Sequence, residues 1–401
     1  MSIKFVDREN QDIKNLVQIA WEHLEDHRNE VLLVPERTEQ FHELINDSEK
    51  ATPGTQSDHE SDLKLERLNE VSRMGRPRRL NPPPIIAVDA GVVNLGSLAK
   101  GGIVFAVRGA ACCYTSEGNV IILRYNTGAI PIDQQNKLKV LHAMGKRLGE
   151  PEFFVKEIDE DPYLQEKSGV IETTDQLQDR FRNFVERIIQ AEAVGILKKY
   201  NGGILIIDGA LPDRSYDTPK NYLLNTSQKI GMLYEADQNC IDVVAISKKT
   251  RITVEGIPIQ KLLTEKYGPD FIGFLPLKDA VSLERKEGRS KQSGIKQRIR
   301  VTMAKEMYAA RFGFGPLSMT FRVDVHNCKG KRASEVINDV YNYCRIYGGY
   351  PKPLIEAHQN SCFLFQDFQN LLADVAVRLG VKPEEQPSME VLFQPFGSFG
   401  K

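Results

Sequence analysis

Apolar residues follow two different patterns along this chain. Some form short continuous runs rich in Val and Ile, which predict buried strands, and others recur every three or four positions, which predicts amphipathic helices. The predicted strands are Ile85–Val88 and the runs 101–115, 119–126, 202–211, 241–247 and 318–326. The predicted helices cover 10–28, a segment after Pro35, 174–199, 218–236, 257–266, 333–347 and 360–379.

The order of these elements predicts the fold class. Only Ser-Glu-Gly separates the runs 101–115 and 119–126, and so short a connection between β-rich runs predicts an antiparallel hairpin. With Ile85–Val88 the hairpin makes three strands, after which helices and strands alternate. We therefore predict an α/β protein with a mixed sheet and helices on both faces.

Polarity divides the chain into three parts. Residues 1–80 predict an N-terminal helical region that contains a flexible polar loop at 46–62, where no aromatic residue occurs. Residues 81–380 contain the predicted sheet, and we assign them to one large domain. Residues 381–401 form a C-terminal tail.

Composition narrows the class of protein. With 41% hydrophobic and 27% charged residues, the chain has the composition of a soluble globular protein. No apolar run reaches membrane-spanning length and the N-terminus lacks the apolar core of a signal peptide, so we expect a cytoplasmic protein with no membrane partner. The six cysteines contain no Cys-x-x-Cys pair, which predicts reduced thiols and no zinc site.

Basic residues are clustered although the net charge is only −1. One cluster precedes the first strand and another lies between 285 and 305, and such clusters attract phosphates even in a neutral chain. A solvated loop and helix face is the competing interpretation. The residues that we predict to bind DNA are Arg76, Arg78, Arg79, Lys291, Lys296, Arg298 and Arg300.

Two predicted strands end in an acid that small residues follow. Asp89 comes after Ile85–Val88, Asp208 follows the apolar part of the run 202–211, and Glu186 lies on the helix between them. If the two strands are neighbours, the three carboxylates converge, and such a cluster ionises fully only around cations such as Mn²⁺ or Mg²⁺. Two ions about 4 Å apart hydrolyse phosphodiesters, and acids on the first strand, a helix and the fourth strand are the layout of ribonuclease H-like nucleases. The alternative is that the aspartates are ordinary turn residues and the glutamate is solvated.

Five motifs occur in the order in which the NurA family of DNA repair nucleases has them. The sequence resembles that family over roughly residues 80–370. The motifs are "RYNTGAIP", "DRFRNFVE", "ILIIDGALP", "VVAISKKTR" and "YGGYPKPLIEAHQNSCF". The resemblance implies an RNase H-like fold, Mn²⁺-dependent cleavage of single- and double-stranded DNA with 5′ to 3′ polarity, a homodimer, and a hexameric HerA-type ATPase as partner.

The resemblance also assigns roles to residues. Matched position by position, it implies that the metal ligands and other catalytic residues are Asp89, Glu186, Asp208, Tyr350 and His358. Where the family usually has Asp-Gly-Ser, this chain has Asp89-Ala90-Gly91, so the turn there is expected to differ. Glu192 competes with Glu186 as the helix ligand, but Arg182, four residues before Glu186, has the family spacing.

The chemistry of three further side chains completes the predicted site. His358 suits a neutral metal ligand or a base that orients water, and Tyr350 could donate a hydrogen bond to a phosphate. Lys248, after the strand 241–247, could stabilise developing negative charge, with Lys249 as its competitor. The structural alternatives are a buried histidine, a core tyrosine and a surface lysine.

Two other functions stay open at this stage. "VDAGVVN" imitates the first phosphate loop of actin-like or sugar-kinase-like ATPases, although no adenosine loop follows. A non-catalytic DNA-binding subunit of an ATPase is the other. The sequence has no Gly-x-x-x-x-Gly-Lys-Ser/Thr loop, so ATP-driven movement would come from a partner.

Overall fold

The structure is a computed structural model of the 401-residue chain. It describes the following residues, and every structural statement below refers to them: 3–25, 33–35, 71–74, 82–98, 102–133, 136–145, 174–211, 223–247, 252–254, 256–278, 281–286, 298–304, 306–315, 318–328, 330–344 and 347–380. The polar loop 46–62, the helix predicted after Pro35 and the tail 381–401 lie outside these residues.

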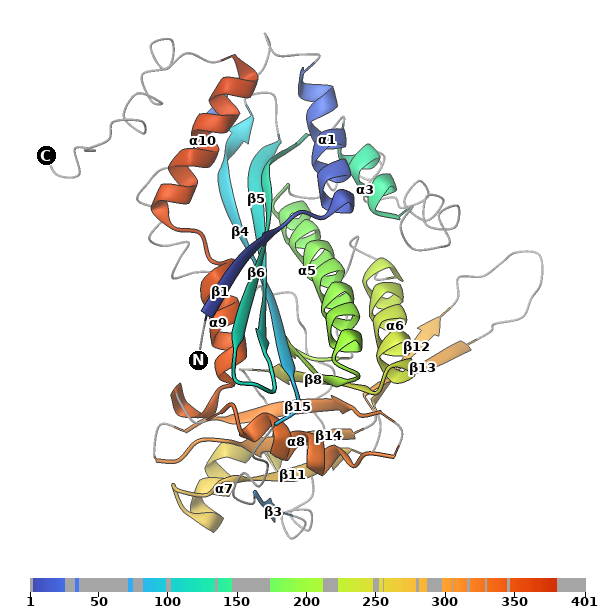
Figure 1. The fold of residues 1–401 in the computed structure, drawn as a ribbon, viewed down its shortest axis with the longest axis vertical. Helices are drawn as coiled ribbons and strands as arrows, with labels where there is room; N and C mark the ends of the chain where they lie inside the picture. Colours follow the sequence, from blue (N-terminus) through green and yellow to red (C-terminus); the bar gives the residue numbers. More distant parts are fainter. Residues whose placement is uncertain are drawn as a thin grey trace, which may run out of the picture.

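A large mixed sheet forms the centre of the molecule (Figure 1). Its middle has the strand order β6-β5-β4-β7-β8, in which β4, β5 and β6 are antiparallel while β7 and β8 run parallel to β4. The bounds are β4 (Ile85–Leu98), β5 (Ile103–Tyr114), β6 (Val120–Ile132), β7 (Gly203–Asp208) and β8 (Ile241–Ser247). This order confirms the predicted fold class, a mixed α/β sheet flanked by helices.

The sheet continues on both sides of these five strands. On one side β1 pairs with β6 as the edge strand, and β2 pairs with the far end of β4. On the other side the order is β8-β15-β14-β11-β3, and β9–β10 and β12–β13 are separate two-stranded sheets. The bounds are β1 (Ile3–Arg8), β2 (Leu33–Pro35), β3 (Ser72–Arg73), β9 (Thr253–Val254), β10 (Ile257–Pro258), β11 (Gly273–Lys278), β12 (Val281–Lys286), β13 (Arg298–Ala304), β14 (Glu306–Arg311) and β15 (Thr320–His326).

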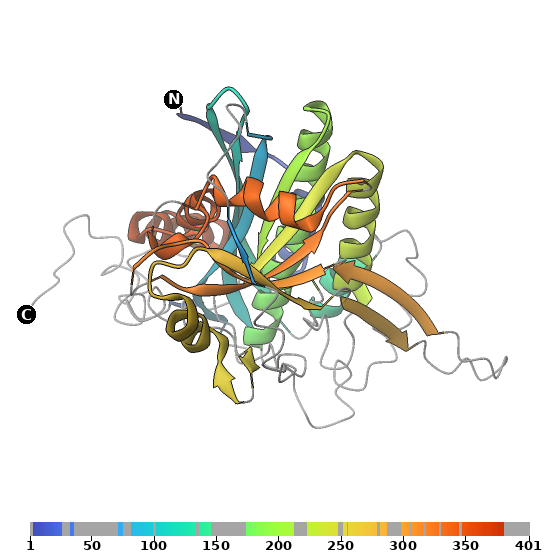
Figure 2. The ribbon, with the colours of Figure 1, turned by 90° about the horizontal axis from the view of Figure 1, so that it is seen from below.

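Helices cover both faces of the sheet. In Figure 2 the green helices α5 and α6 and the red C-terminal helices lie on opposite sides of β4 and its neighbours. The bounds are α1 (Gln11–Glu25), α3 (Lys137–Gly145), α5 (Thr174–Lys199), α6 (Leu223–Gln238), α7 (Ile259–Tyr267), α8 (Ala333–Tyr341), the 3₁₀ helix η4 (Tyr347–Gly349), α9 (Lys352–Ser361) and α10 (Phe365–Leu379).

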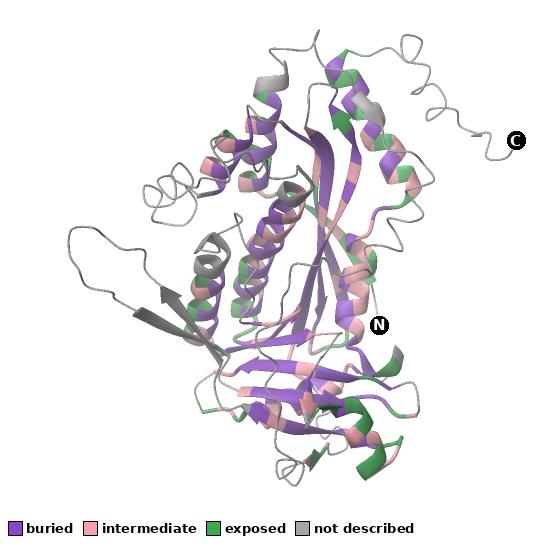
Figure 3. Ribbon diagram, turned by 180° about the vertical axis from the view of Figure 1, so that it is seen from behind, coloured by how far each residue is buried: buried purple, intermediate pink, exposed green. Residues whose placement is uncertain are grey.

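Alternation along the central strands divides the core in two. Ile86 and Val88 of β4 pack in the core under α5 and α6, whereas Ile85 and Ala87 pack in the core under α8 and α9. The central strands are therefore buried on both faces, as Figure 3 shows by their purple colour. Continuous apolar runs are the expected sequence of strands covered in this way.

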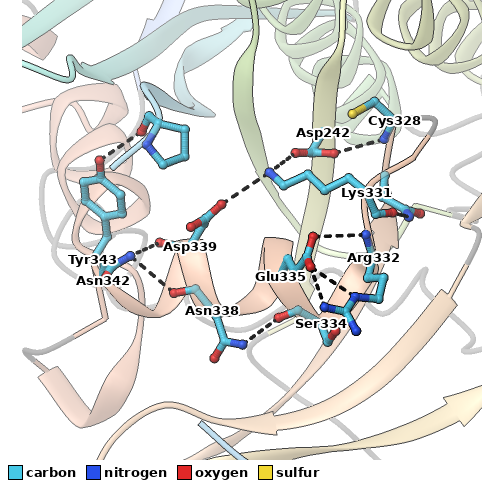
Figure 4. A network of polar contacts seen from close by, with 12 residues as sticks. Asp242, Cys328, Lys331, Arg332, Ser334, Glu335, Asn338, Asp339, Asn342 and Tyr343 are labelled. Carbon is cyan, nitrogen blue, oxygen red and sulfur yellow. Dashed lines mark hydrogen bonds and ion pairs between the residues drawn. The ribbon is translucent and has the colours of Figure 1, made fainter. Parts of the chain in front are cut away.

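A buried ion pair ties α8 to the sheet (Figure 4). Lys331 Nζ lies 2.6 Å from Asp242 Oδ2 at the start of β8 and 3.3 Å from Asp339 Oδ2 of α8. Burial acts to lower the pKa of Lys331, but the two carboxylates outweigh it and raise this pKa. The backbone N–H of Cys328 donates to Asp242 Oδ1, so the end of β15 is held at the same point.

Most predicted elements are present, and the differences have local causes. The helix predicted over 174–199 has those bounds in the structure. The single helix predicted over 360–379 is instead α10 alone, preceded by the unpredicted α9, because Cys362 takes an extended conformation between them. The edge strand β1 and the strands β11 and β14 were not predicted. Among the described helices, none is both long and apolar enough to cross a membrane.

Candidate active site

Asp89 and Asp208 lie side by side on neighbouring strands. β4 and β7 are parallel and in register from Ile85 opposite Ile204 to Val88 opposite Ile207, so the two aspartates are the next pair. The side chains two and four residues earlier on each strand all belong to the core under α8 and α9. Because side chains alternate along a strand, both carboxylates point to that same face.

Helix α9 brings His358 onto Asp89. The imidazole Nδ1 lies 2.7 Å from Asp89 Oδ2, and Nε2 lies 3.8 Å from the Cys362 thiol. The hydrogen bond to Asp89, then that to Cys362, raises the pKa of His358 from its ordinary 6.5 to about 10. The ring is therefore an imidazolium at neutral pH in this arrangement, paired with the carboxylate, and not the neutral imidazole that the sequence analysis predicts.

Gly91 permits this close approach. A Cβ at Gly91 would lie 2.5 Å from the carbonyl oxygen of Ser361, which is too close for two atoms that are not bonded to each other. The glycine thus lets the last turn of α9 rest directly on β4. The prediction of a strand end and a turn at Asp89-Ala90-Gly91 is wrong, because all three residues lie within β4 (Ile85–Leu98), where the glycine stands at the point at which the helix meets the strand.

Tyr350 contacts the second aspartate. Its hydroxyl donates to Asp208 Oδ1 over 3.1 Å, and burial together with the charge of Asp208 raises its pKa well above the ordinary value. Gly349 precedes it at φ 95°, and a Cβ there would lie 2.2 Å from the backbone N of Gly313. Pro351 follows as the N-cap of α9. In the sequence Gly-Tyr-Pro, the glycine therefore makes the turn, the tyrosine directs its hydroxyl to Asp208, and the proline begins the helix that carries His358.

Glu186 approaches from the opposite layer. It lies on α5, whose Val185 and Ile189 pack in the other core, and its Oε1 accepts hydrogen bonds from Gln190 at 2.7 Å and Arg187 at 3.3 Å. Burial raises the pKa of Glu186, Arg187 and Arg182 oppose this, and the charge of Asp89 adds to it. The carboxylate is thus within electrostatic reach of Asp89 but hydrogen-bonded within its own helix.

Glu192 has a different place. Its Oε2 accepts a hydrogen bond from the Tyr125 hydroxyl at 2.7 Å, and its Oε1 accepts one from the Asn10 amide. Asn10 in turn accepts from the backbone N–H groups of Asp12 and Ile13 at the start of α1. Glu192 therefore joins α1 to α5 and β6, which favours Glu186 as the helix acid of the site.

The turn after Asp208 is held by buried polar groups. Lys229 Nζ donates to the carbonyl oxygens of Ala210 and Leu211 at 3.2 and 3.3 Å. The buried Asp324 accepts the N–H of Leu211 at 3.0 Å, and burial raises its pKa. These contacts fix the backbone beside Asp208, and neither Lys229 nor Asp324 belongs to a motif of the sequence that points to the site.

The donor set fits a divalent metal in part. The two neighbouring carboxylates are ligands that Mn²⁺ and Mg²⁺ accept, whereas the protonated ring of His358 would become a ligand only after it loses its proton. Across the described residues, however, no three or more His, Cys, Asp or Glu side chains are arranged as a metal-binding group. Asp89 and Asp208 could hold an ion, and a third protein ligand would require Glu186 or His358 to exchange its present partner.

The other predicted site residues are outside the described part of the chain or on strands whose side chains are not described. Lys248, Arg76, Arg78, Arg79, Lys291 and Lys296 fall in the first group. Arg298 and Arg300 lie on β13, which pairs with β12 and contacts α6 and β15. Their roles stay predictions.

Cys362 and Ser361 were not predicted at the site. The hydroxyl of Ser361 donates to the His358 carbonyl at 2.9 Å, and Cys362 follows His358 by four residues. That i, i+4 spacing was the available signal, but it applies only if 352–361 is recognised as a helix. The two prolines near its start concealed it.

The His358–Asp89 pair predicts how stability depends on pH. Because the pKa of His358 is 6.5 when unperturbed and about 10 in the folded protein, the folded state retains a proton that the unfolded state releases. The stabilisation is complete below pH 6.5 and is lost as the pH rises to 10. We expect the difference in unfolding free energy between the parent and His358→Gln, from urea titrations, to be constant at acidic pH and to shrink over this range. A difference that grows with pH would contradict the pairing.

No protein-family model matches the sequence, and no curated protein matches it. Among solved structures, the chain is similar to the NurA nuclease from Sulfolobus solfataricus, with 14% identity, a TM-score of 0.43 and coverage of 85% of this chain and 94% of that one. A NurA structure with manganese has 13% identity, a TM-score of 0.37 and coverage of 85% and 98%. A NurA structure bound to dAMP and manganese has 12% identity, a TM-score of 0.35 and coverage of 88% and 93%. All three of these structures are of NurA.

Proposed function

We propose that this protein is a metal-dependent deoxyribonuclease whose active site is the Asp89–Asp208 pair. The observation that carries the proposal is the register of β4 and β7, which sets two carboxylates side by side on one face. Two negative charges on adjacent strands repel each other unless a proton or a cation lies between them. His358 and Tyr350, each hydrogen-bonded to one aspartate, come from a single short segment of chain.

Each of these residues has a distinct task in the proposed site. Asp89 and Asp208 would hold Mn²⁺ or Mg²⁺, with Glu186 as the further ligand, and one or two such ions would activate water and stabilise the leaving oxygen. His358 holds a proton at Nδ1 and orients the Asp89 carboxylate. Tyr350 does the same for Asp208 through its hydroxyl, so both carboxylates are held in fixed rotamers before any ligand arrives.

The sequence motifs support a finer proposal. On the resemblance to NurA, the protein would cleave single-stranded DNA internally and degrade DNA from the 5′ end, as a homodimer, in DNA end processing or defence. The domain 81–380 would contain the nuclease site. A hexameric HerA-type ATPase would supply ATP-driven movement, since the sequence lacks a Gly-x-x-x-x-Gly-Lys-Ser/Thr loop.

The test separates the nuclease from an ATPase and from a non-catalytic subunit. End-labelled DNA is incubated with the purified chain in Mn²⁺ without ATP, with EDTA as control. We expect the DNA to be shortened in Mn²⁺ and intact in EDTA. Intact DNA, together with ATP hydrolysis in a parallel assay to which ATP is added, would favour an actin-like ATPase. Intact DNA that is nonetheless bound would favour a DNA-binding subunit.

DNA affinity is predicted to depend on the basic segment near β13. The quadruple substitution of Lys291, Lys296, Arg298 and Arg300 by alanine should weaken binding similarly for all sequences. Each lost phosphate contact removes about 0.7 to 0.9 from the slope of log affinity against log salt. Fluorescence anisotropy in Ca²⁺ over a salt series measures this slope. An unchanged slope would show that the segment is a solvated surface.

A further inference from the structure

An exposed aromatic ring lies on the same face of the sheet as the aspartate pair. Register places Asp89 opposite Ala110 of β5, and Ala110 opposite Arg124 of β6. These three residues form one row across the sheet, so their side chains share a face. On β1, Phe5 lies opposite Ile122, which belongs to the core under α9, and Phe5 therefore points to that face as well.

Arg124 connects this ring to the active-site helix. Its guanidinium lies 4.8 Å from the centroid of the Phe5 ring, and its Nη2 donates to Asn360 Oδ1 at 2.7 Å. Asn360 is on α9, two residues after His358. Phe5, which is 56% exposed, is thus joined through Arg124 and Asn360 to the helix that carries His358.

The basic side chains on and beside α9 have different partners. Arg108 pairs with Asp367 at 2.8 Å and Lys352 pairs with Glu356 at 3.3 Å. The hydrogen bonds of Arg124, in contrast, go to the amide oxygen of Asn360. This group is neutral, so these bonds do not neutralise the positive charge of the guanidinium. Asp7 lies opposite Arg124 in the register, and its negative charge disfavours a phosphate at this point. The flat faces of Phe5 and Arg124 are therefore better suited to a base than to a phosphate.

We propose that Phe5 and Arg124 form a stacking platform for an unpaired base of single-stranded DNA whose backbone runs along α9 to the aspartate pair. This inference rests on the proposed nuclease function. Strands lie about 4.8 Å apart, so Arg124 is about 10 Å from Asp89 across the sheet, within the span of a few nucleotides. Aromatic rings and guanidinium groups stack on any base, and only an unpaired base offers them a free face.

The experiment compares two exposed residues on one face of one strand. Phe5 and Ile3 are 56% and 55% exposed, so Ile3→Ala is a matched control for Phe5→Ala. Binding of a fluorescein-labelled single-stranded oligonucleotide and of a blunt duplex is measured by anisotropy in Ca²⁺, with the mass of each variant measured by light scattering. We expect Phe5→Ala to weaken single-strand binding about 5- to 100-fold, with little change for the duplex and for Ile3→Ala. Phe5→Trp should retain affinity, and the salt dependence should not change because no charge is lost.

Three outcomes would overturn the platform. They are equal losses for Phe5→Ala and Ile3→Ala, equal losses for single strand and duplex, or a loss of mass in Phe5→Ala that shows the edge to be an interface between two copies. Failure of the proposed function looks different, because the parent would then bind single-stranded DNA in Ca²⁺, with its Phe5 dependence, but leave it intact in Mn²⁺.

Discussion

Replacing Asp89 by asparagine should lower Mn²⁺-dependent DNA cleavage by about a thousandfold or more while the protein stays folded. Asparagine keeps the volume of the side chain, and its carbonyl oxygen can still accept the hydrogen bond from His358. It removes the negative charge that would hold the ion, and metal stabilisation of a phosphodiester transition state amounts to several kcal/mol. Single-turnover cleavage of end-labelled DNA measures the rate, and a thermal melt confirms the fold.

Asp7→Asn is the matched control for this substitution. Asp7 lies in the same row across the sheet as Asp89, through Arg124 and Ala110, but at the exposed edge strand. It should cleave DNA at close to the parent rate. Similar losses in both variants would mean that carboxylates on this face act through general charge, and equal activity of Asp89→Asn and the parent would place the site elsewhere.

Replacing Gly91 by alanine should have the second largest effect. The added methyl group would meet the carbonyl oxygen of Ser361 at 2.5 Å, which is backbone and cannot rotate away. The last turn of α9 must then move off β4, and His358 with it. Overpacking of this kind costs about 1 to 3 kcal/mol of folding stability. We expect a lower urea midpoint and a cleavage rate reduced more than the loss of folded protein explains.

Gly195→Ala separates this steric effect from a general effect of adding a methyl group. Gly195 is on α5, and a Cβ there would have no atom within 4 Å. Alanine is favoured over glycine in a helix by about 1 kcal/mol, so this variant should be as stable as the parent or more stable. A Gly91→Ala protein with parental stability and activity would show that α9 is not held against β4 as described.

The sequence predicted the aspartate pair because its cause is local. A strand that is apolar on both faces is expected to be central and covered, and if two such strands are neighbours, the acids that follow their apolar runs come together. Only β7 ends at its aspartate, because β4 continues beyond Asp89 to Leu98. The structure confirms the neighbouring strands. Helix α5 was also predicted with its observed bounds, since 26 residues of helical spacing leave little freedom in its position.

The remaining features depend on contacts that the local pattern does not contain. Pro351 and Pro353 indicate a break in the chain, yet they stand at the N-cap and in the first turn of α9, where proline is tolerated. The side of the sheet on which Glu186 lies depends on which face of the sheet α5 covers. The hydrogen-bond partners of Glu186, Gln190 and Arg187, lie on α5 as well. The edge strand β1 is short and mostly exposed, so its apolar residues show no core pattern.

The most direct test of the aspartate pair is a calorimetric titration of Mn²⁺ into the parent, Asp208→Asn and Asp7→Asn, without DNA. Asp208→Asn removes one carboxylate of the pair, whereas Asp7→Asn removes one at the sheet edge. We expect saturable Mn²⁺ binding by the parent and by Asp7→Asn, and its loss in Asp208→Asn with the thermal melt unchanged. Equal Mn²⁺ binding by all three proteins would contradict the assignment of Asp89 and Asp208 as the metal site.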